Sequence, residues 1–310
     1  MIYVIDLFCG AGGFSQGAVD AGAVVVLAVD HWKVALDVHA LNHSDCEHWC
    51  RDLGGSQEEF VSDVNVFLKQ KGLMGKHIHV HASPPCQNLS SYTQRFDRKE
   101  IGLAMVKWAV EIMDLLRPMT WTLEQVPHLE VISMLRAHGN VAVIDCSEFG
   151  ISQTRRRVIA GTFNQTVLTA HKESPVTMRD VFASVRYTPP RKGMGMTTVT
   201  RIRDKQGKLT KDRVKSFDAV GYTICAVQPR MFDPVLHTSQ MIPREVMAAL
   251  QTFPPGYKFG VHFRQMIANS VPPKLACKVM RSLSARPSSA DDDLHPCDNV
   301  LQCSHDGVVG

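Results

Sequence analysis

Short apolar segments alternate with helix-length segments along the first 163 residues, and this alternation limits the folds that the chain can adopt. The most apolar segment, Ala23–Val29 (AVVVLAV), has no polar position, which is typical of a strand buried on both faces. Further strands are expected at Ile2–Leu7, Ile78–Ala82, Thr120–Val126, Val141–Cys146 and Arg157–Phe163. Helices are expected at Phe14–Ala21, Lys33–Leu41 and Ala104–Leu116. The pattern predicts an α/β fold, with a mostly parallel sheet and helices on both of its faces.

Glycine-rich or polar blocks follow directly after three of the predicted strands, at Phe8, Ser83 and Glu124. In a parallel sheet the carboxyl ends of the strands share one edge, and ligands bind in the crevice beside that edge. The three blocks are therefore expected to meet at one ligand site.

The pattern changes after the last predicted strand. Residues 165–240 are rich in Gly, Pro, Thr and basic residues, and they are expected to form a small irregular module beside a catalytic domain of residues 1–164. Helix-like patterns return at Arg244–Thr252 and Lys274–Leu283, so residues 241–285 are expected to pack back on the catalytic domain. The polar residues 286–310 are expected to be a disordered tail.

Charge and cysteine content narrow the classes of function. The net charge of +4 permits binding to nucleic acid, and the ten Lys or Arg against two Asp from Arg186 to Lys215 suit either a phosphate backbone or a solvated loop. Nine irregularly spaced cysteines and a start without a signal-peptide pattern favour an intracellular protein. No apolar run has the length of a membrane span.

Glycines follow the first strand in the segment Asp6–Gly13 (DLFCGAGG). Glycine permits a tight turn and a close approach of the backbone to a ligand. Asp30 ends the next strand, where a carboxylate can accept from ribose hydroxyls, and Asp52 could contact an adenine amino group. An ordinary α/β turn without a nucleotide has the same pattern, so the turn alone leaves both interpretations open.

Cys86 stands in the segment SPPCQNLS, where prolines would present its thiol rigidly. A thiolate that adds to C6 of cytosine converts C5 into a nucleophilic enamine carbon. The addition needs a carboxyl group to neutralise charge developing on the ring, and Glu124 is the candidate. Arg157 could hold the base carbonyl, and Arg155 could support Glu124. Each residue alone has an ordinary structural explanation, but their combination and order favour catalysis.

The order of these blocks resembles the DNA (cytosine-5) methyltransferases over nearly all of residues 1–283. The resemblance is carried by DLFCGAGG, Pro85-Cys86-Gln87, Glu124-Gln125-Val126, Gln153–Arg157, Arg244–Pro254 and Gln265–Pro273. It implies the Rossmann-like fold of methyltransferases that use S-adenosyl-L-methionine (AdoMet), and a covalent adduct between Cys86 and the base. Gln125 stands where the family usually has Asn.

The resemblance also implies the residues of a cofactor pocket. Phe8 would stack on the adenine, the glycines would flank the methionine part, and His31 or Trp32 would pack on the adenine. The expected cofactor-binding residues are Asp6, Phe8, Gly10, Gly12, Gly13, Asp30, His31, Trp32, Asp52, Pro85, Asn269 and Ser270.

Double-stranded DNA is the substrate that the resemblance implies, with the target cytosine flipped out of the helix. The loop after Cys86 would close over the base, with Ser90, Gln94 and Arg95 contacting nucleic acid, and residues 165–240 would recognise the target. Two alternatives stay open: a tRNA cytosine-5 methyltransferase, although the Cys-Phe-Thr tripeptide usual in that branch is absent, and a catalytically silent DNA-binding scaffold.

Two groups of potential metal ligands occur outside these motifs. The first consists of His43, Cys46, His48 and Cys50, and the second of His295, Cys297, Cys303 and His305. Neither has paired Cys-x-x-Cys spacing, so no metal is expected. The chain is expected to act as a monomer.

Overall fold

A computed structural model of the chain describes residues 1–85, 96–188, 193–197, 214–226, 229–233, 235–236 and 238–283. Within these residues the large sheet has the spatial order β3 (Glu47–Cys50), β2 (Val24–Asp30), β1 (Ile2–Leu7), β4 (His77–Ala82), β5 (Thr120–Gln125), β7 (Arg156–Gly161), β6 (Asn140–Asp145). Strands β1 to β5 are parallel, and β7 runs antiparallel to both of its neighbours. The predicted mostly parallel sheet is therefore confirmed.

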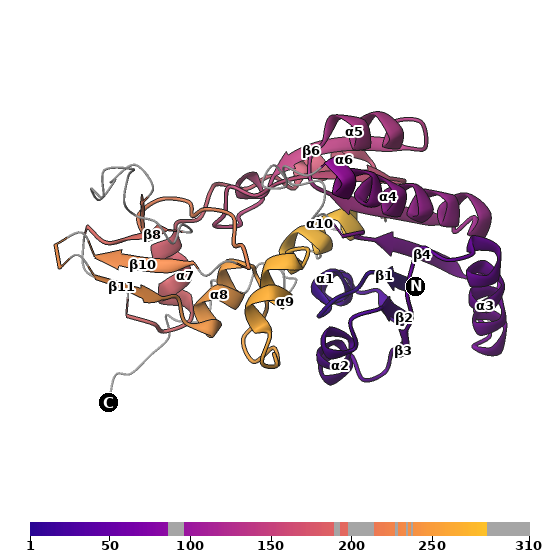
Figure 1. Cartoon of the computed structure of the whole chain (residues 1–310), viewed down its shortest axis with the longest axis horizontal. Coiled ribbons are helices and arrows are strands. Elements are labelled where there is room, and N and C mark those ends of the chain that lie inside the picture. Colours follow the sequence, from indigo (N-terminus) through magenta and orange to yellow (C-terminus); the bar gives the residue numbers. More distant parts are fainter. Residues whose placement is uncertain are drawn as a thin grey trace, which may run out of the picture.

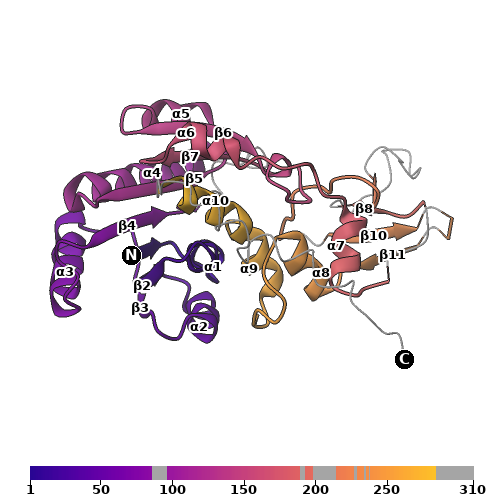
Figure 2. The same cartoon turned by 180° about the vertical axis from the view of Figure 1, so that it is seen from behind.

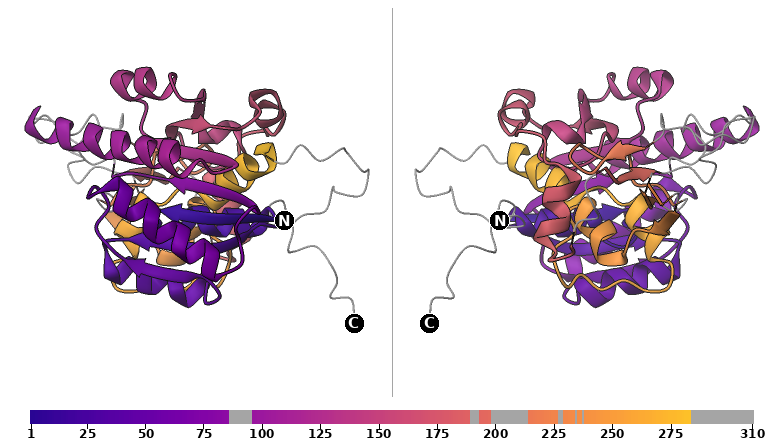
Figure 3. Two further views of the ribbon diagram at one scale, coloured as in Figure 1. Left: turned by 90° about the vertical axis from the view of Figure 1, so that its right-hand side faces the viewer. Right: turned by 90° about the vertical axis from the view of Figure 1, so that its left-hand side faces the viewer.

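Helices cover both faces of this sheet, as the alternation of segments predicted (Figure 3). One face is covered by α3 (Gln57–Gln70), α4 (Phe96–Leu116) and α5 (Leu129–Leu135). The other is covered by α1 (Gly13–Asp20), α2 (Lys33–Asn42), α6 (Gln165–Ala170) and α10 (Pro273–Leu283). None of the helices within the described ranges is long and apolar enough to cross a membrane.

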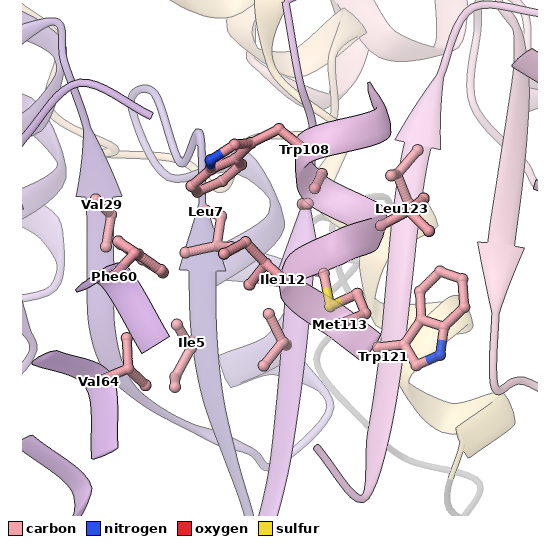
Figure 4. Close-up of a cluster of buried hydrophobic side chains, with 14 of the residues drawn as sticks. Ile5, Leu7, Val29, Phe60, Val64, Trp108, Ile112, Met113, Trp121 and Leu123 are labelled. Carbon is pink, nitrogen blue, oxygen red and sulfur yellow. The ribbon is translucent and has the colours of Figure 1, made fainter. Parts of the chain in front are cut away.

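The main core lies between the sheet and the helices α3 and α4 (Figure 4). Alternate residues of β1, Ile5 and Leu7, point to this side and are fully buried. They pack with Phe60 of α3 and with Trp108 and Ile112 of α4. Because side chains alternate along a strand, the other residues of β1 point to the opposite face of the sheet. On that face Val4 packs in a second core with α1 and α10. The site at the end of β1 therefore stands on a strand fixed from both sides.

Histidines alternate along β4 and form a hydrogen-bonded ladder with the threonines of β5. Thr120 Oγ1 lies 2.9 Å from His77 Nε2 and 3.0 Å from His79 Nδ1. Thr122 Oγ1 lies 3.0 Å from His79 Nε2 and 2.9 Å from His81 Nδ1. The ladder gives partners to polar groups that β4 buries, and the burial lowers the pKa of His79 to about 3.

A smaller lobe adjoins the large one (Figures 1 and 2). Its antiparallel sheet has the order β11 (Thr238–Met241), β10 (Arg230–Asp233), β8 (Gly195–Thr197), β9 (Lys215–Ser216) within the described residues. The hydrophobic core of this lobe joins the sheet to α7 (Met178–Ser184), α8 (Arg244–Leu250) and α9 (Phe263–Asn269). Two segments lie differently from the expected division of the chain, because α6 packs on α10 of the large lobe and α8 packs on α7 of the small one.

Candidate active site

A cavity of about 530 Å³ lies at the carboxyl ends of four parallel strands. Its lining includes Phe8 after β1, Asp30 at the end of β2, Ser83 after β4 and Glu124 in β5. The helix α9 and the turn that follows it supply a further wall. The blocks that were expected to meet at one ligand site do so, because parallel strands bring their carboxyl ends to one edge of the sheet.

The turn between β1 and α1 exposes its backbone to the cavity. Phe8 has a φ of 58° and Gly10 a φ of 52°, in the left-handed region that costs a non-glycine residue energy. The Phe8 ring packs edge-on against Trp108, with 6.0 Å between ring centroids. A Cβ at Gly10 would meet nothing within 4 Å. A ligand in the cavity can therefore approach the backbone of Gly10 closely.

Asp30 holds the turn in place from the neighbouring strand. Its Oδ2 accepts a hydrogen bond from Gly10 N at 2.8 Å, and its Oδ1 accepts one from Trp32 N at 2.7 Å. A carboxylate has about four acceptor positions, so Asp30 keeps the capacity to accept from a ligand. Of the two aromatic candidates beside it, the His31 side chain is 60% exposed, whereas the Trp32 ring packs 6.0 Å from that of His262.

Gly13 lets the C-terminal segment approach the turn. A Cβ at Gly13 would lie 2.3 Å from the Val271 carbonyl oxygen and 2.8 Å from the Ser270 Cβ. The Ser270 hydroxyl donates to Met266 O at 2.7 Å, which fixes the end of α9. Together with Asn269, these residues line the cavity. The Ser270–Val271 turn can thus pack against the glycine turn, and form this wall of the cavity, only because Gly13 has no side chain.

The proline segment after β4 is anchored at Ser83 and Pro84. Ser83 donates from its hydroxyl to Phe8 O at 3.2 Å and from its backbone N to Leu7 O at 3.2 Å. The buried Gln125 side chain donates to Pro84 O at 3.0 Å, and its Oε1 accepts from Val126 N at 2.8 Å. Gln125 stands where the family usually has Asn, and its side chain makes two hydrogen bonds there.

Glu124 and Arg157 form an ion pair that faces the cavity. Arg157 Nε lies 2.7 Å from Glu124 Oε1, and the two side chains are only 10% and 9% exposed. The two atoms lie within ion-pair distance, but their geometry is not that of a hydrogen bond, because Glu124 Oε1 has no hydrogen-bond partner. Arg157 also donates to Arg156 O at 2.8 Å. A carboxyl group that a cation holds at the wall of a cavity can serve a polar edge of a bound ring.

Arg155 lies outside the cavity lining and joins the two lobes. Its buried guanidinium donates to Ile224 O at 3.4 Å in the small lobe and to Ala268 O at 3.1 Å and Ser270 O at 3.3 Å. Gln153, two residues earlier, accepts from Ile224 N at 2.9 Å and donates to Leu250 O at 2.6 Å. This segment therefore holds the small lobe and the wall of the cavity against the large sheet.

Three further residues from the expected cofactor set lie away from the cavity. Asp6 is fully buried on the α1 face, where its Oδ2 accepts from the Ser15 hydroxyl at 2.6 Å. Burial raises the pKa of Asp6 to about 7, and its Oδ1 has no hydrogen-bond partner. Gly12 faces Tyr257 and His39, and Asp52 is not among the lining residues. Cys86, Ser90, Gln94 and Arg95 lie outside the described residues.

The sequence reasoning missed several lining residues of α9 and the turn before it. His262, Gln265 and Met266 line the cavity together with Trp32 and Asn269. Gln265 opens the segment Gln265–Pro273 that carried part of the resemblance, so a signal for this wall was present. The contribution of His262 could not be found in the same way, because it depends on the return of the chain to the large lobe.

Comparison with known proteins places these features in a family. The family model for C-5 cytosine-specific DNA methylase matches residues 2–180. Type II methyltransferase M.HgiDI of Herpetosiphon aurantiacus is 27% identical, over 91% of this chain and 94% of the relative. Type II methyltransferase M.HindV of Haemophilus influenzae is 26% identical, over 88% and 93%. A third relative, M.AgeI of Thalassovita gelatinovora, is 29% identical, but the match spans only 38% of its length.

Solved structures show the same fold. A protein described as a DNA modification methyltransferase, encoded within a prophage of E. coli, aligns with a TM-score of 0.65 at 20% identity, over 91% of this chain and 98% of its own. The Dnmt2 methyltransferase of S. pombe aligns with a TM-score of 0.64 at 15% identity, with the same coverage. Since the family model covers more than half of the sequence, this chain belongs to the C-5 cytosine-specific DNA methylases, the enzymes that methylate C5 of cytosine in DNA.

Proposed function

We propose that this chain methylates C5 of a flipped-out cytosine in double-stranded DNA, with AdoMet as cofactor and Cys86 as covalent nucleophile. The observation that carries the proposal is a single cavity shared by two kinds of group. Phe8, Gly10 and Asp30 line it together with Glu124 and Arg157, and Pro85, the residue before Cys86, lines it too. A nucleoside cofactor and a base would thus be held side by side.

The lining fits AdoMet at several points. Asp30 retains acceptor capacity for ribose hydroxyls, and Trp32 and His262 offer aromatic faces near it. The open backbone at Gly10 leaves room beside the turn, and the cavity volume lies within the range of sites for molecules of this size. When bound, AdoMet supplies a methyl group on a positively charged sulfur. His31, Asn269 and Ser270 complete the proposed cofactor site.

The chemistry at the base follows from charge. Cys86 Sγ, as the thiolate, forms a bond to C6. The C5–C6 π electrons shift to the C4–C5 bond, and the C4–N3 π electrons move onto N3. Glu124 neutralises the charge that develops near N3, and Arg157 binds the base carbonyl while holding Glu124 in position. C5 would then take the methyl group, with its bond to the sulfonium sulfur broken and the cofactor left as the neutral thioether S-adenosyl-L-homocysteine. The C5 proton leaves to solvent, and the bond between Sγ and C6 breaks to restore the aromatic ring and the thiolate.

The remaining assignments concern DNA. Ser90, Gln94 and Arg95 are proposed to contact the nucleic acid around the flipped base, and the small lobe is proposed to read the target. Arg155 is a positioning residue in this proposal, because it joins the small lobe to the wall of the cavity through Ile224 and Ser270. The enzyme is proposed to act as a monomer.

The test is transfer of a tritiated methyl group from AdoMet to unmethylated genomic DNA and, separately, to bulk tRNA, followed by nucleoside analysis. The proposal expects label in 5-methyldeoxycytidine from DNA. Label in tRNA alone would move the substrate to RNA. Absence of label from both would favour a catalytically silent DNA-binding scaffold, provided that the protein is folded and binds DNA.

A further inference from the structure

A histidine and cysteine cluster lies beside the glycine turn, next to Gly12, and none of its residues is among those lining the cavity. His39 of α2, Cys46 before β3 and His48 in β3 place one potential ligand atom each within 4.8 Å of one another. His39 Nδ1 and His48 Nε2 are 2.8 Å apart. His39 and Cys46 are buried, whereas His48 is half-buried and leaves a path from solvent. The three residues come from only ten positions of the chain.

The cluster differs from the one suggested by sequence spacing. His43 is near His39, but its Nε2 lies 3.3 Å from the Tyr257 hydroxyl. Cys50 is exposed, and its Sγ–H points to His31 O at 3.8 Å. The helical residue His39, which the sequence spacing did not indicate, joins Cys46 and His48 of the first predicted group. The second predicted group, in the tail, lies outside the described residues: His295, Cys297, Cys303 and His305.

Hydrogen bonds fix which nitrogen of His39 is free to bind. When Asp6 is ionised, above its raised pKa of about 7, the Ser15 hydroxyl donates its single proton to Asp6 Oδ2 at 2.6 Å, so the Ser15 oxygen accepts at the 2.9 Å contact with His39 Nε2. His39 therefore carries its proton on Nε2 and directs a bare Nδ1 toward His48 and Cys46. A histidine that ligates a metal is characteristically held through its other nitrogen in this way.

We propose that His39 Nδ1, Cys46 Sγ and His48 Nε2 bind a Zn²⁺ ion. Imidazole nitrogen and thiolate sulfur are the ligands that zinc prefers, and zinc accepts three protein ligands with water at the fourth position. Two nitrogens on one tetrahedral zinc stand about 3.3 Å apart, so His39 and His48 need to separate by only about 0.5 Å. Cys46 releases its thiol proton to solvent on binding, which makes the affinity rise with pH.

The position of the ion predicts a structural effect. A Cβ at Gly12 would lie 3.0 Å from His39 Cδ2, so His39 packs directly against the glycine turn. An ion at this cluster would tie α2 and the start of β3 together beneath that turn. Anything that binds the folded state alone stabilises it, so zinc is expected to raise the unfolding temperature. This proposal does not depend on the methyl-transfer reaction.

The experiment is titration of the purified, metal-free chain with Zn²⁺ by calorimetry and with Co²⁺ by absorbance, at about pH 8 in a buffer without thiols. The expected result is one ion per chain, a thiolate-to-cobalt absorption band, and an unfolding temperature raised by several degrees. Cys46→Ser and His48→Gln should each lower the zinc affinity by at least about 100-fold. Cys50→Ser, at an exposed cysteine four residues away, is the matched control and should bind like the wild type.

Three outcomes would overturn the proposal: no stoichiometric binding, a cobalt complex without a thiolate band, or equal loss of affinity in Cys50→Ser. In the first case the contact between His39 and His48 is a simple hydrogen bond between imidazoles. Circular dichroism of each variant separates a lost ligand from a lost fold, and His48→Gln changes a half-buried residue and is the milder of the two.

Discussion

Arg157 Nε lies 2.7 Å from Glu124 Oε1, and both residues line the cavity. Oε1 is buried against the cation. Arg157 therefore holds the Glu124 carboxyl group in place at the wall of the cavity. The arrangement depends on the antiparallel pairing of β5 and β7, which sets Glu124 opposite Ile159 and so brings Arg157 alongside.

Removal of the Glu124 carboxyl group should slow methyl transfer strongly and leave the affinity for DNA nearly unchanged. Glu124→Gln keeps the size of the side chain but cannot neutralise charge on the ring, so the rate of methyl transfer should fall by about 10²–10⁴-fold. Single-turnover transfer measures the rate, and a fluorescence titration should show DNA affinity within a few-fold of wild type. Glu148→Gln, which removes an exposed ion pair with Lys172, is the control. A rate within tenfold of wild type would contradict the role of Glu124.

Gln125 should matter for both stability and catalysis. Gln125→Leu removes the donor to Pro84 O and the acceptor for Val126 N, and it leaves these buried backbone groups without partners. The free energy of unfolding should fall by about 1–3 kcal/mol, as measured by urea denaturation. Methyl transfer should fall as well, because the segment that leads to Cys86 loses an anchor. Gln70→Leu, at the exposed end of α3, should change neither quantity appreciably; equal effects of the two variants would refute the assignment.

A methyl group at Gly13 should displace the wall of the cavity. The added Cβ of Gly13→Ala would lie 2.3 Å from Val271 O, where backbone must shift. AdoMet affinity should fall by at least tenfold in calorimetry, which corresponds to about 1.4 kcal/mol. Gly55→Ala is the matched control, since nothing lies within 4 Å of its added Cβ and its backbone is not left-handed. Unchanged affinity in Gly13→Ala would mean that the Ser270–Val271 turn does not form the cofactor wall.

Asp6 should make the stability of the protein decrease as pH rises from about 4 to 7. Its pKa is raised from 3.8 to about 7 by burial, so the folded state keeps a proton that the unfolded state loses in this range. The contribution of Asp6 to the free energy of unfolding is fully present below pH 4. It is lost as the pH rises through 7, by at most about 4 kcal/mol. Asp6→Asn does not titrate, so its stability relative to wild type should rise between pH 4 and 8 in urea denaturation.

The control for this titration is Asn65→Ala, which changes an exposed side chain that does not titrate. Its difference in stability from wild type should stay constant with pH. If Asp6→Asn also ran parallel to wild type from pH 4 to 8, Asp6 would be ionised in the folded protein throughout, and its raised pKa would be refuted.

The sequence predicted those strands of the large sheet that are marked by apolar runs, such as β1 and β2. It missed β3, because Glu47–Cys50 is a short edge strand of mostly polar residues whose pairing partner decides its structure. It also missed α3, although Phe60, Val64 and Phe67 repeat at helical spacing and Ser56 caps the helix through Glu59 N. The antiparallel direction of β7 could not be inferred, because the apolar pattern of a strand does not indicate whether it runs parallel or antiparallel to its neighbours.

The residues of the site also fall into those that the sequence predicted and those that it did not. Residues near the carboxyl end of a predicted strand, such as Phe8, Asp30 and Glu124, could be predicted, because the parallel strands bring these ends to one edge. His262 lies far along the chain, and only the packing of α9 brings its ring to Trp32. Arg155 was expected to support Glu124, and the structure shows its guanidinium bonded to carbonyl groups of Ile224, Ala268 and Ser270 instead. Such lobe-to-lobe contacts leave no local pattern in the sequence.

The most direct test of the covalent reaction uses DNA in which 5-fluorocytosine replaces the target cytosine. Fluorine cannot leave C5 as a proton does, so the bond between Cys86 and C6 cannot be released after methyl transfer. With AdoMet present, the account predicts a protein–DNA species that survives denaturing electrophoresis and yields a peptide modified at Cys86 in mass spectrometry, and no such species from Cys86→Ser. A wild-type enzyme that methylates ordinary DNA but forms no trapped species, or a Cys86→Ser variant that still transfers methyl groups, would contradict it.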